Sequence, residues 1–330
     1  MRRTPPLLLF ACALGLPAGA VAQHPTQGPL TAEEGAPLQR LGFTPTVEGA
    51  AVTPRGAVRV DLWLAYGNVW EQDSSAVANV FLDLERLIVA PTVRVGVLEG
   101  LELGVRATLE RTGGGFLDGL VTGLHDVVGA GDRNRPDYPA NRYGQWLRDA
   151  RGKLLVEIPG RSRPALEDVR LFAKWRAYAS ADDRRAVSVT GAVRVPTADN
   201  LLGEERADAA LTVAGHAGWR GWYLHGLVGG TTVRRSPELR DVLRDRQWLF
   251  MAGAERPLSP TLSLLIQATG STQLLQDLGE HDVDGALTNV VFGVAWRQGP
   301  WRWEVALQED APARGPSTDF TVQVGVSRAW

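Results

Sequence analysis

The residues of this chain that could do chemistry are charged side chains that alternate with apolar ones along short segments of the sequence. Because successive side chains of a β-strand point to opposite faces, these charges would share one face of each strand. If that face lines a closed interior, the lining candidates are Arg59, Asp61, Glu102, Arg106, Glu110, Arg170, Lys174, Arg176, Arg302, Glu304 and Asp310. Mixed charges of this kind either pair and hold a narrow interior shut, or line an aqueous channel and set its charge preference. The sequence leaves both interpretations open.

Catalytic and metal chemistry find little support in the histidines. Outer-membrane lipid hydrolases use a closely spaced His and Ser on one strand face, activated by a third polar residue. His125-Asp126 has no nearby nucleophile and no HExxH-like partner, and the only cysteine is Cys12, near the N-terminus. We therefore expect no catalytic residues, no metal ligands and no cofactor, with a lipid-acting outer-membrane enzyme as a distant alternative.

Segments with a period of two recur along the chain and are separated by turn residues. We predict twelve strands, at 58–70, 79–97, 101–111, 169–177, 186–196, 207–218, 222–234, 246–256, 261–272, 286–297, 301–310 and 319–330. Short connections such as 98–100 alternate with long ones such as 112–166, as short periplasmic turns and long external loops do in bacterial outer-membrane barrels. The sequence thus predicts an all-β fold, a transmembrane antiparallel up-and-down β-barrel of about twelve strands over residues 56–330.

Aromatic residues and the closing segment agree with such a barrel. Several tryptophans lie beside the short turns, as a periplasmic aromatic girdle requires: Trp219, Trp222, Trp296, Trp301, Trp303 and Trp330. The last segment puts Phe320, Val322, Val324 and Val326 on one face and ends on Trp330, a pattern that resembles the C-terminal signal read by the β-barrel assembly machinery. Arg328 falls on the same outward face, and we expect its guanidinium to snorkel to water.

The N-terminus is typical of an exported protein. Residues 1–22 combine two arginines, a short apolar run and an A-x-A site, which predicts a cleavable signal peptide. Residues 23–55 are rich in Pro, Gly, Ala and Glu without a period, so we predict a flexible periplasmic segment. The formal net charge of −2 argues against nucleic acid as a partner. The expected location is the outer membrane of a Gram-negative cell, with its lipids and the β-barrel assembly machinery as partners.

The long external connection 112–166 contains a segment with helical spacing. Its apolar residues recur as on one face of a helix: Leu117, Leu120, Val121, Leu124, Val127 and Val128. The opposite face carries Asp118, Thr122, His125 and Asp126. We predict a short helix in this second external loop. Folded across the barrel mouth, it would narrow a path with its polar face; alternatively, it packs on neighbouring external loops.

Four stretches of the sequence resemble a known family: GGGFLDGLVTGLHDVVG (113–129), YPANR (138–142), VRVPTADN (193–200) and the closing ED…STDFT (309–321). They are similar to the uncharacterised family catalogued as domain of unknown function 3187, over most of the chain. The resemblance implies a Gram-negative outer-membrane barrel and supplies no activity, substrate or catalytic residue.

Together these observations favour a narrow pore or small-solute channel of the outer membrane, gated by the loop 112–166. A small solute or ion would then be a further partner. The alternative is a barrel without a conducting path that serves as a structural or surface protein. The sequence does not separate the two, because the same inward charges serve either purpose.

Overall fold

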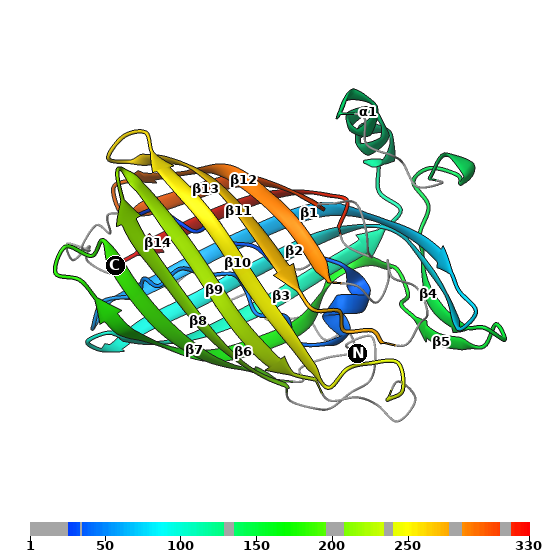
Figure 1. The fold of residues 1–330 in the computed structure, drawn as a ribbon, viewed down its shortest axis with the longest axis horizontal. Helices are drawn as coiled ribbons and strands as arrows, with labels where there is room; N and C mark the ends of the chain where they lie inside the picture. Colours follow the sequence, from blue (N-terminus) through cyan, green and yellow to red (C-terminus); the bar gives the residue numbers. More distant parts are fainter. Residues whose placement is uncertain are drawn as a thin grey trace, which may run out of the picture.

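A computed structural model describes residues 26–33, 35–128, 135–195, 208–233, 240–276, 286–310 and 318–330. Twelve long strands form a closed antiparallel barrel, in which each strand pairs with its neighbours along the chain and β1 pairs with both β2 and β14 (Figure 1). The barrel strands are β1 Val58–Ser74, β2 Ala78–Leu98, β3 Leu101–Gly113, β6 Arg161–Ala179, β7 Arg185–Val195, β8 Asp208–Trp219, β9 Trp222–Thr232, β10 Arg246–Pro257, β11 Leu262–Ser271, β12 Leu287–Gln298, β13 Trp301–Asp310 and β14 Phe320–Ala329. The predicted fold class is confirmed.

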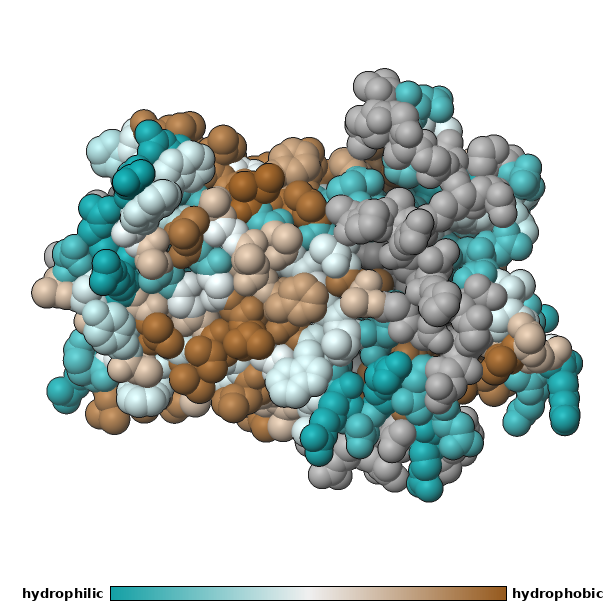
Figure 2. All heavy atoms as spheres, in the orientation of Figure 1, coloured by the Kyte–Doolittle hydropathy of each residue, from teal (hydrophilic) through white to brown (hydrophobic). Residues whose placement is uncertain are grey.

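The period of two in the sequence becomes an inner and an outer face of the barrel wall. On β9, Leu224 and Val228 are exposed on the outside, whereas Tyr223, His225 and Leu227 are buried inside. Hydrophobic side chains gather over the middle of the wall and hydrophilic ones near its ends (Figure 2). An outward apolar band between polar rims is what a lipid-facing barrel surface requires. Within the described part of the chain, no helix has the length and hydropathy to cross a bilayer.

The two ends of the barrel differ, as the alternation of connections predicts. One end carries the tight turns β2–β3, β6–β7, β8–β9, β10–β11 and β12–β13 together with the C-terminus, and we call it the short-turn end (Figure 1). At the opposite, long-loop end, β2 extends far enough to pair with an added strand, β4 (Gly144–Asp149), which pairs in turn with β5 (Leu154–Glu157). The connection predicted over 112–166 therefore contains a hairpin and the start of β6.

The helix predicted in this connection is α1 (Asp118–Val128), but it does not narrow the mouth. Leu117 and Val121 pack with Phe320, a residue that shares the outer face of β14 with the exposed Val322 and Val324. Figure 1 likewise places α1 outside the barrel, beyond the long-loop end. The constriction predicted from the polar face of the helix is wrong, because Leu117 and Val121 of the apolar face find their hydrophobic partners on the outer wall.

The four predicted constriction residues accordingly contact the wall and the loop or face solvent. Asp118 accepts a 2.9 Å hydrogen bond from Asn68, and His125 lies 3.6 Å from Glu309 on the outer face of β13. Thr122 is half-buried and Asp126 is exposed. These residues of α1 are thus spread over the outer wall and the surface.

The C-terminal strand β14 closes the barrel against β1 and gives Arg328 a specific environment. The Arg328 guanidinium carbon lies 4.6 Å from the ring centroid of Trp330 and 5.1 Å from that of Trp301. A cation over an aromatic face is attracted by the ring quadrupole, more strongly where it is partly desolvated. Two indole rings therefore compensate the charge that the sequence placed on the outward face.

We expect Arg328→Ala to lower the free energy of unfolding of the barrel by about 0.5–2 kcal/mol, because both cation–π contacts are lost. Denaturant titration in phospholipid vesicles, followed by tryptophan fluorescence, measures the change. Arg151→Ala, which removes an exposed arginine from the turn between β4 and β5, is the control and should leave the transition in place. Equal midpoints for the two variants would contradict the prediction.

The N-terminal segment lies inside the barrel. Residues 26–33 and 35–55, which we call the plug, run along the lumen to the long-loop end, form the 3-10 helix η2 (Pro37–Leu41), and return (Figure 1). On the way to the long-loop end, the Thr26 hydroxyl donates to Glu255 near the short-turn end, and the backbone N–H of Leu30 donates to Gln267 further along. On the return, Arg55 forms a bridge with Gly96, again at the short-turn end.

This path corrects the prediction of a flexible periplasmic segment for the described part of residues 23–55. Leu30, Leu38 and Gln39 have no exposed surface, and the backbone of Leu30 exchanges hydrogen bonds with the side chain of Gln267 on the wall. Irregular backbone is stable where its polar groups are satisfied, and a polar lumen offers those partners. The lack of a sequence period indicated irregular structure correctly, but not its burial.

Candidate functional site

The lumen is the candidate site, and its most unusual feature is a set of arginines that face one another across adjacent strands. Arg59 of β1 is the register partner of Arg94 of β2, and Arg106 of β3 is that of Arg170 of β6. A third pair, Arg297 and Arg302, joins β12 to β13. Like charges directly opposite each other destabilise a sheet unless something compensates them. The compensation differs among the three pairs.

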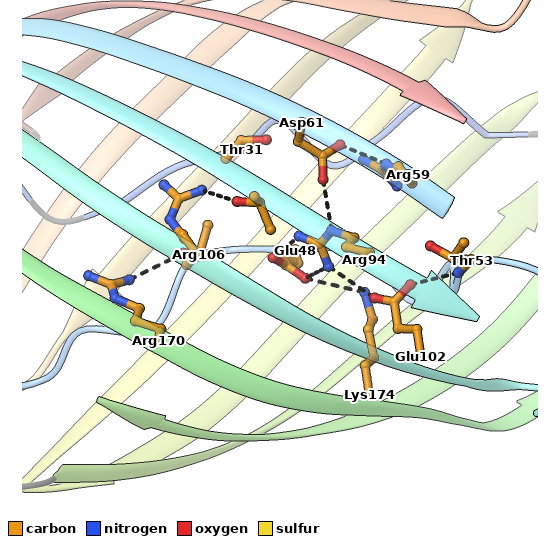
Figure 3. Close-up of polar contacts among 12 residues, drawn as sticks. Thr31, Glu48, Thr53, Arg59, Asp61, Arg94, Glu102, Arg106, Arg170 and Lys174 are labelled. Carbon is orange, nitrogen blue, oxygen red and sulfur yellow. Dashed lines mark hydrogen bonds and ion pairs between the residues drawn. The ribbon is translucent and has the colours of Figure 1, made fainter. Parts of the chain in front are cut away.

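The first pair is compensated by carboxylates from the wall and the plug (Figure 3). Asp61 accepts from Arg59 Nε at 2.7 Å and from Arg94 Nε at 2.8 Å, so that it bridges the two guanidinium groups. Arg94 also donates through Nη1 to Glu102 at 2.9 Å and to Glu48 of the plug at 3.0 Å. These charge-assisted hydrogen bonds are the stronger kind in proteins, and they tie the plug to the wall.

Glu48 has a second cationic neighbour on the wall, Lys174, whose Nζ lies 3.4 Å from Oε2 of the carboxylate (Figure 3). Burial alone would raise the pKa of Glu48, but the charges of Arg94 and Lys174 outweigh burial and hold this pKa well below its ordinary value. Glu48 is therefore a carboxylate at neutral pH. Next to it, the backbone N–H of Thr53 in the plug donates to Glu102 at 2.6 Å.

The second pair is compensated by the plug through Glu33. Its Oε1 lies 3.0 Å from Arg106 Nη2 and 2.9 Å from Arg170 Nη1, so one carboxylate oxygen bridges both guanidinium groups. Burial again acts to raise the pKa of Glu33, and the charges of Arg106, Arg170 and Arg40 with a hydrogen bond from Thr46 bring it below the ordinary value. Arg170 also pairs with Asp168 on its own strand, at 3.0 Å.

Next to the plug, at the short-turn end, the lumen keeps a cavity of about 520 Å³. Its boundary includes residues 26–29 of the plug on one side and the inner faces of β1, β12 and β13 on the other. The third pair, Arg297 and Arg302, lines this cavity. The arrangement therefore combines two anchored carboxylates of the plug with one polar space that the plug leaves unfilled.

The structure brings most of the predicted lining residues into this lumen. Six of them border the cavity: Arg59, Asp61, Arg106, Lys174, Arg302 and Glu304. Glu102 and Arg170 belong to the ion pairs around the plug, Glu110 pairs with Arg86 at 2.9 Å, and Asp310 is buried at the long-loop end of β13. Arg176 lies apart, 3.5 Å from Asp183 and 3.7 Å from Glu99 at the short-turn end.

Sequence reasoning missed four groups that make the site. Arg94 and Arg297 lie on the inward positions of β2 and β12, and counting alternate residues through those less regular segments would have found them. Glu33 and Glu48 lie in the plug, where the sequence has no period and offers no comparable signal. In the described part of the chain, no group of His, Cys, Asp and Glu side chains is arranged to hold a metal ion.

Solved structures with a similar fold are outer-membrane barrels. The COG4313 outer membrane channel from Pseudomonas putida F1 is 13% identical and superimposes with a TM-score of 0.52, over 84% of this chain and 97% of that chain. The NanC porin, at 9% identity and a TM-score of 0.45, covers 82% of this chain and 98% of its own. The translocator domain of the autotransporter NalP from Neisseria meningitidis is 11% identical, with a TM-score of 0.41, over 83% and 88% of the two chains.

At these identities the likeness extends to the fold alone, an outer-membrane type of β-barrel. No curated protein shows significant sequence similarity to this chain. A family model, in contrast, matches residues 6–330, which is nearly the whole sequence. It covers the long loop, the inward arginines and the closing strand together. The chain therefore belongs to the family described as protein of unknown function (DUF3187).

Proposed function

We propose that this protein is a narrow outer-membrane channel for a small solute or ion, and that the plug regulates its conduction. The observation that carries the proposal is the double passage of the plug along the lumen, anchored by Glu33 and Glu48. A barrel of about twelve strands has an interior wider than the side-chain-filled eight-stranded barrels. With the plug removed, that interior would be a polar path lined by charges. The loop 112–166 is not the gate in this proposal, because α1 lies outside.

A second candidate function is a barrel without a conducting path, in which the plug is a permanent filling. The complete burial of Leu30 and Gln39 and the bridged arginine pairs favour it. Buried ion pairs are costly to break by removing one partner, so the docked plug is held firmly. The two candidates differ in one respect, which is whether the plug leaves the lumen while the barrel stays folded.

A reversible crosslink between the plug and the wall tests this difference. An ideal Cβ on Gly35 would lie 3.4 Å from Cβ of Thr318, close to the 3.5–4.5 Å that disulfides require. The only native cysteine is Cys12, so the double variant Gly35→Cys/Thr318→Cys would carry one new pair after export. We expect oxidised protein in planar bilayers to give no steps above background, and a reducing agent to restore wild-type steps.

The single variant Thr318→Cys is the control, because it leaves Gly35 unchanged, and it should conduct like the wild type with and without the reducing agent. Equal conductance of the oxidised and reduced double variant would reject the plug as the gate. No steps for any of these proteins, while each keeps the heat-modifiable gel migration of a folded barrel, would favour the permanently filled barrel.

We also propose that the protein reaches the outer membrane by export and assembly. The signal peptide predicted at residues 1–22 lies outside the described residues. The closing strand with Phe320 and Trp330 supports recognition by the β-barrel assembly machinery, and the outward apolar band supports contact with membrane lipids. Membrane fractionation of the full-length chain and of a variant that lacks Trp330 would test both points.

A further inference from the structure

The third arginine pair lacks the carboxylate bridge that the other two have. Arg297 donates through Nε to Gln27 Oε1 at 2.6 Å and through Nη2 to the carbonyl oxygen of Thr26 at 3.3 Å. Within the described part of the chain, every acceptor recorded for Arg297 is therefore neutral. Its register partner Arg302 has one carboxylate, Glu304, at 2.6 Å, and otherwise donates to the carbonyl oxygens of Gln27 and Pro29.

The comparison with the other pairs indicates what is missing. Glu33 places one carboxylate oxygen 3.0 Å from Arg106 and 2.9 Å from Arg170, and Asp61 bridges the first pair with one oxygen on each arginine. Between Arg297 and Arg302 the plug presents Gln27, which is neutral, and Glu304 reaches only one member of the pair. The fold thus uses an oxyanion to bridge opposed arginines twice, and leaves the third pair without one.

The cavity beside this pair has an excess of cations and of unused hydrogen-bond donors. Arg328 touches its boundary, but the guanidinium of that residue stacks on Trp301 and Trp330. Three carboxylates line the cavity: Glu48, Asp61 and Glu304. Apart from Arg328, six cations line it: Arg59, Arg94, Arg106, Lys174, Arg297 and Arg302. Glu102 and Glu33, which lie behind the boundary, pair with Arg94 and Arg106, so Arg297 is the lining cation whose recorded acceptors are all neutral.

Several buried donors of residues on the cavity boundary also lack an acceptor among the described residues. Among them are Nε1 of Trp63, a residue that is 3% exposed, and Nε of Arg106, a residue that is 4% exposed. Burying a donor without an acceptor costs about 1–3 kcal/mol. Unused donors beside an excess of cations call for a ligand that accepts hydrogen bonds and carries negative charge.

We propose that this cavity is a binding site for a small oxyanion, a carboxylate or a phosphate, held between Arg297 and Arg302. Guanidinium groups suit such a ligand, because their planar donors match carboxylate and phosphate oxygens. The volume of about 520 Å³ accommodates a small organic acid or a phosphate ester. The inference deepens the proposed function by naming the charge class of the solute, and this assignment of the solute rests on the proposed channel function.

Titration calorimetry at low ionic strength tests the site on the full mature chain in detergent. Succinate and inorganic phosphate are the two probes, so that the arms distinguish a carboxylate from a phosphate source. We expect wild-type protein to bind at least one of them. Arg297→Gln/Arg302→Gln should weaken that binding by at least about tenfold, because charge-assisted hydrogen bonds are lost.

A second variant keeps every arginine and guards against a folding defect. Gln27→Glu is nearly isosteric and puts a carboxylate where Arg297 already donates, so the plug would fill the site itself. We expect it to weaken probe binding by at least about tenfold while the barrel stays folded. Arg256→Gln is the matched control, because that arginine is exposed on the outer side of β10 beside Trp222.

The outcomes separate the site from the channel. Binding of neither probe by the wild type, or wild-type affinity in both the double variant and Gln27→Glu, would overturn the inference. Bilayer recordings run in parallel: steps without binding reject the site alone, whereas binding without steps rejects the channel and leaves the site in place. Arg256→Gln must keep wild-type affinity, and an equal loss in this variant would attribute the effect to overall charge and reject the site.

Discussion

Glu33→Gln should raise the population of the open, plug-free lumen on the order of a hundredfold. Removal of one partner from a buried ion pair costs about 3–5 kcal/mol, since the other charge is left uncompensated. Here one carboxylate oxygen of Glu33 serves both Arg106 and Arg170, at 3.0 Å and 2.9 Å. Each 1.4 kcal/mol is about a factor of ten in an equilibrium, which gives a hundredfold at the lower limit. Open probability in planar bilayers is the measurement.

The matched control for Glu33→Gln is Glu157→Gln, an exposed position on β5 with the same loss of charge. It should conduct like the wild type. If Glu33→Gln also keeps the wild-type open probability and the protein is folded, the plug is not held by this bridge. Glu48→Gln should act in the same direction, because Glu48 anchors the returning part of the plug to Arg94 and Lys174.

Acidification should reproduce these variants only at strongly acidic pH. The pKa of both plug carboxyls is below the ordinary glutamate value of 4.5 when the plug is docked. A group with a lowered pKa stabilises the docked state above its undocked pKa, and this stabilisation is lost as the pH falls through the docked value. Above pH 4.5 the bridges therefore stay intact. If the plug is released at mildly acidic pH, protonation of groups other than Glu33 and Glu48 must cause it.

Gly96→Ala should loosen the plug at its return point without any change in charge. A Cβ on Gly96 would overlap the carbonyl oxygen of Pro54 and crowd that of Thr53, both of them backbone atoms that cannot rotate away. Gly96 also exchanges hydrogen bonds with Gly56 and Ala57, at 2.8 Å and 3.0 Å. Overpacking of a tight contact costs about 1–3 kcal/mol. We expect faster proteolysis within residues 26–55 and a higher open probability.

Gly191→Ala is the matched control for Gly96→Ala, since it makes the same change in a barrel strand where a Cβ would meet nothing within 4 Å. Proteolysis of the plug and open probability should be unchanged in this variant. Equal protease resistance of Gly96→Ala and the wild type would show that the backbone contact at Gly96 does not hold the plug.

The fold was predictable because its signal is local and repeated. A lipid-facing barrel strand must put apolar residues on alternate positions, and β13 and β14 keep that rule until Glu309 and Arg328 near their ends. The strand number followed from counting such segments. The extension of β1 to Ser74 and the early start of β6 at Arg161 did not follow, because they depend on pairing with β2 and β3.

The candidate site was predictable only in part, because the ion pairs that anchor the plug join cations of the wall to carboxylates of the plug. Arg106 and Arg170 carry the alternation of their strands, so the inward cations could be named in advance. Glu33 lies in a segment with no period, and nothing local assigns it to the pair of arginines it bridges. For α1 the spacing gave the helix, but which surface its apolar face covers was decided by the outward Phe320.

The course of the plug has a consequence for the order in which the molecule is built. Thr26 lies near the short-turn end, as does Arg55, and η2 is the bend between them at the other mouth. Both arms of this hairpin reach the same mouth of the barrel, the short-turn end. The hairpin can therefore enter a closed barrel without threading a chain end through it. We therefore expect that the wall can close by pairing of β1 with β14 before the segment inserts, and that insertion is reversible on a finished barrel.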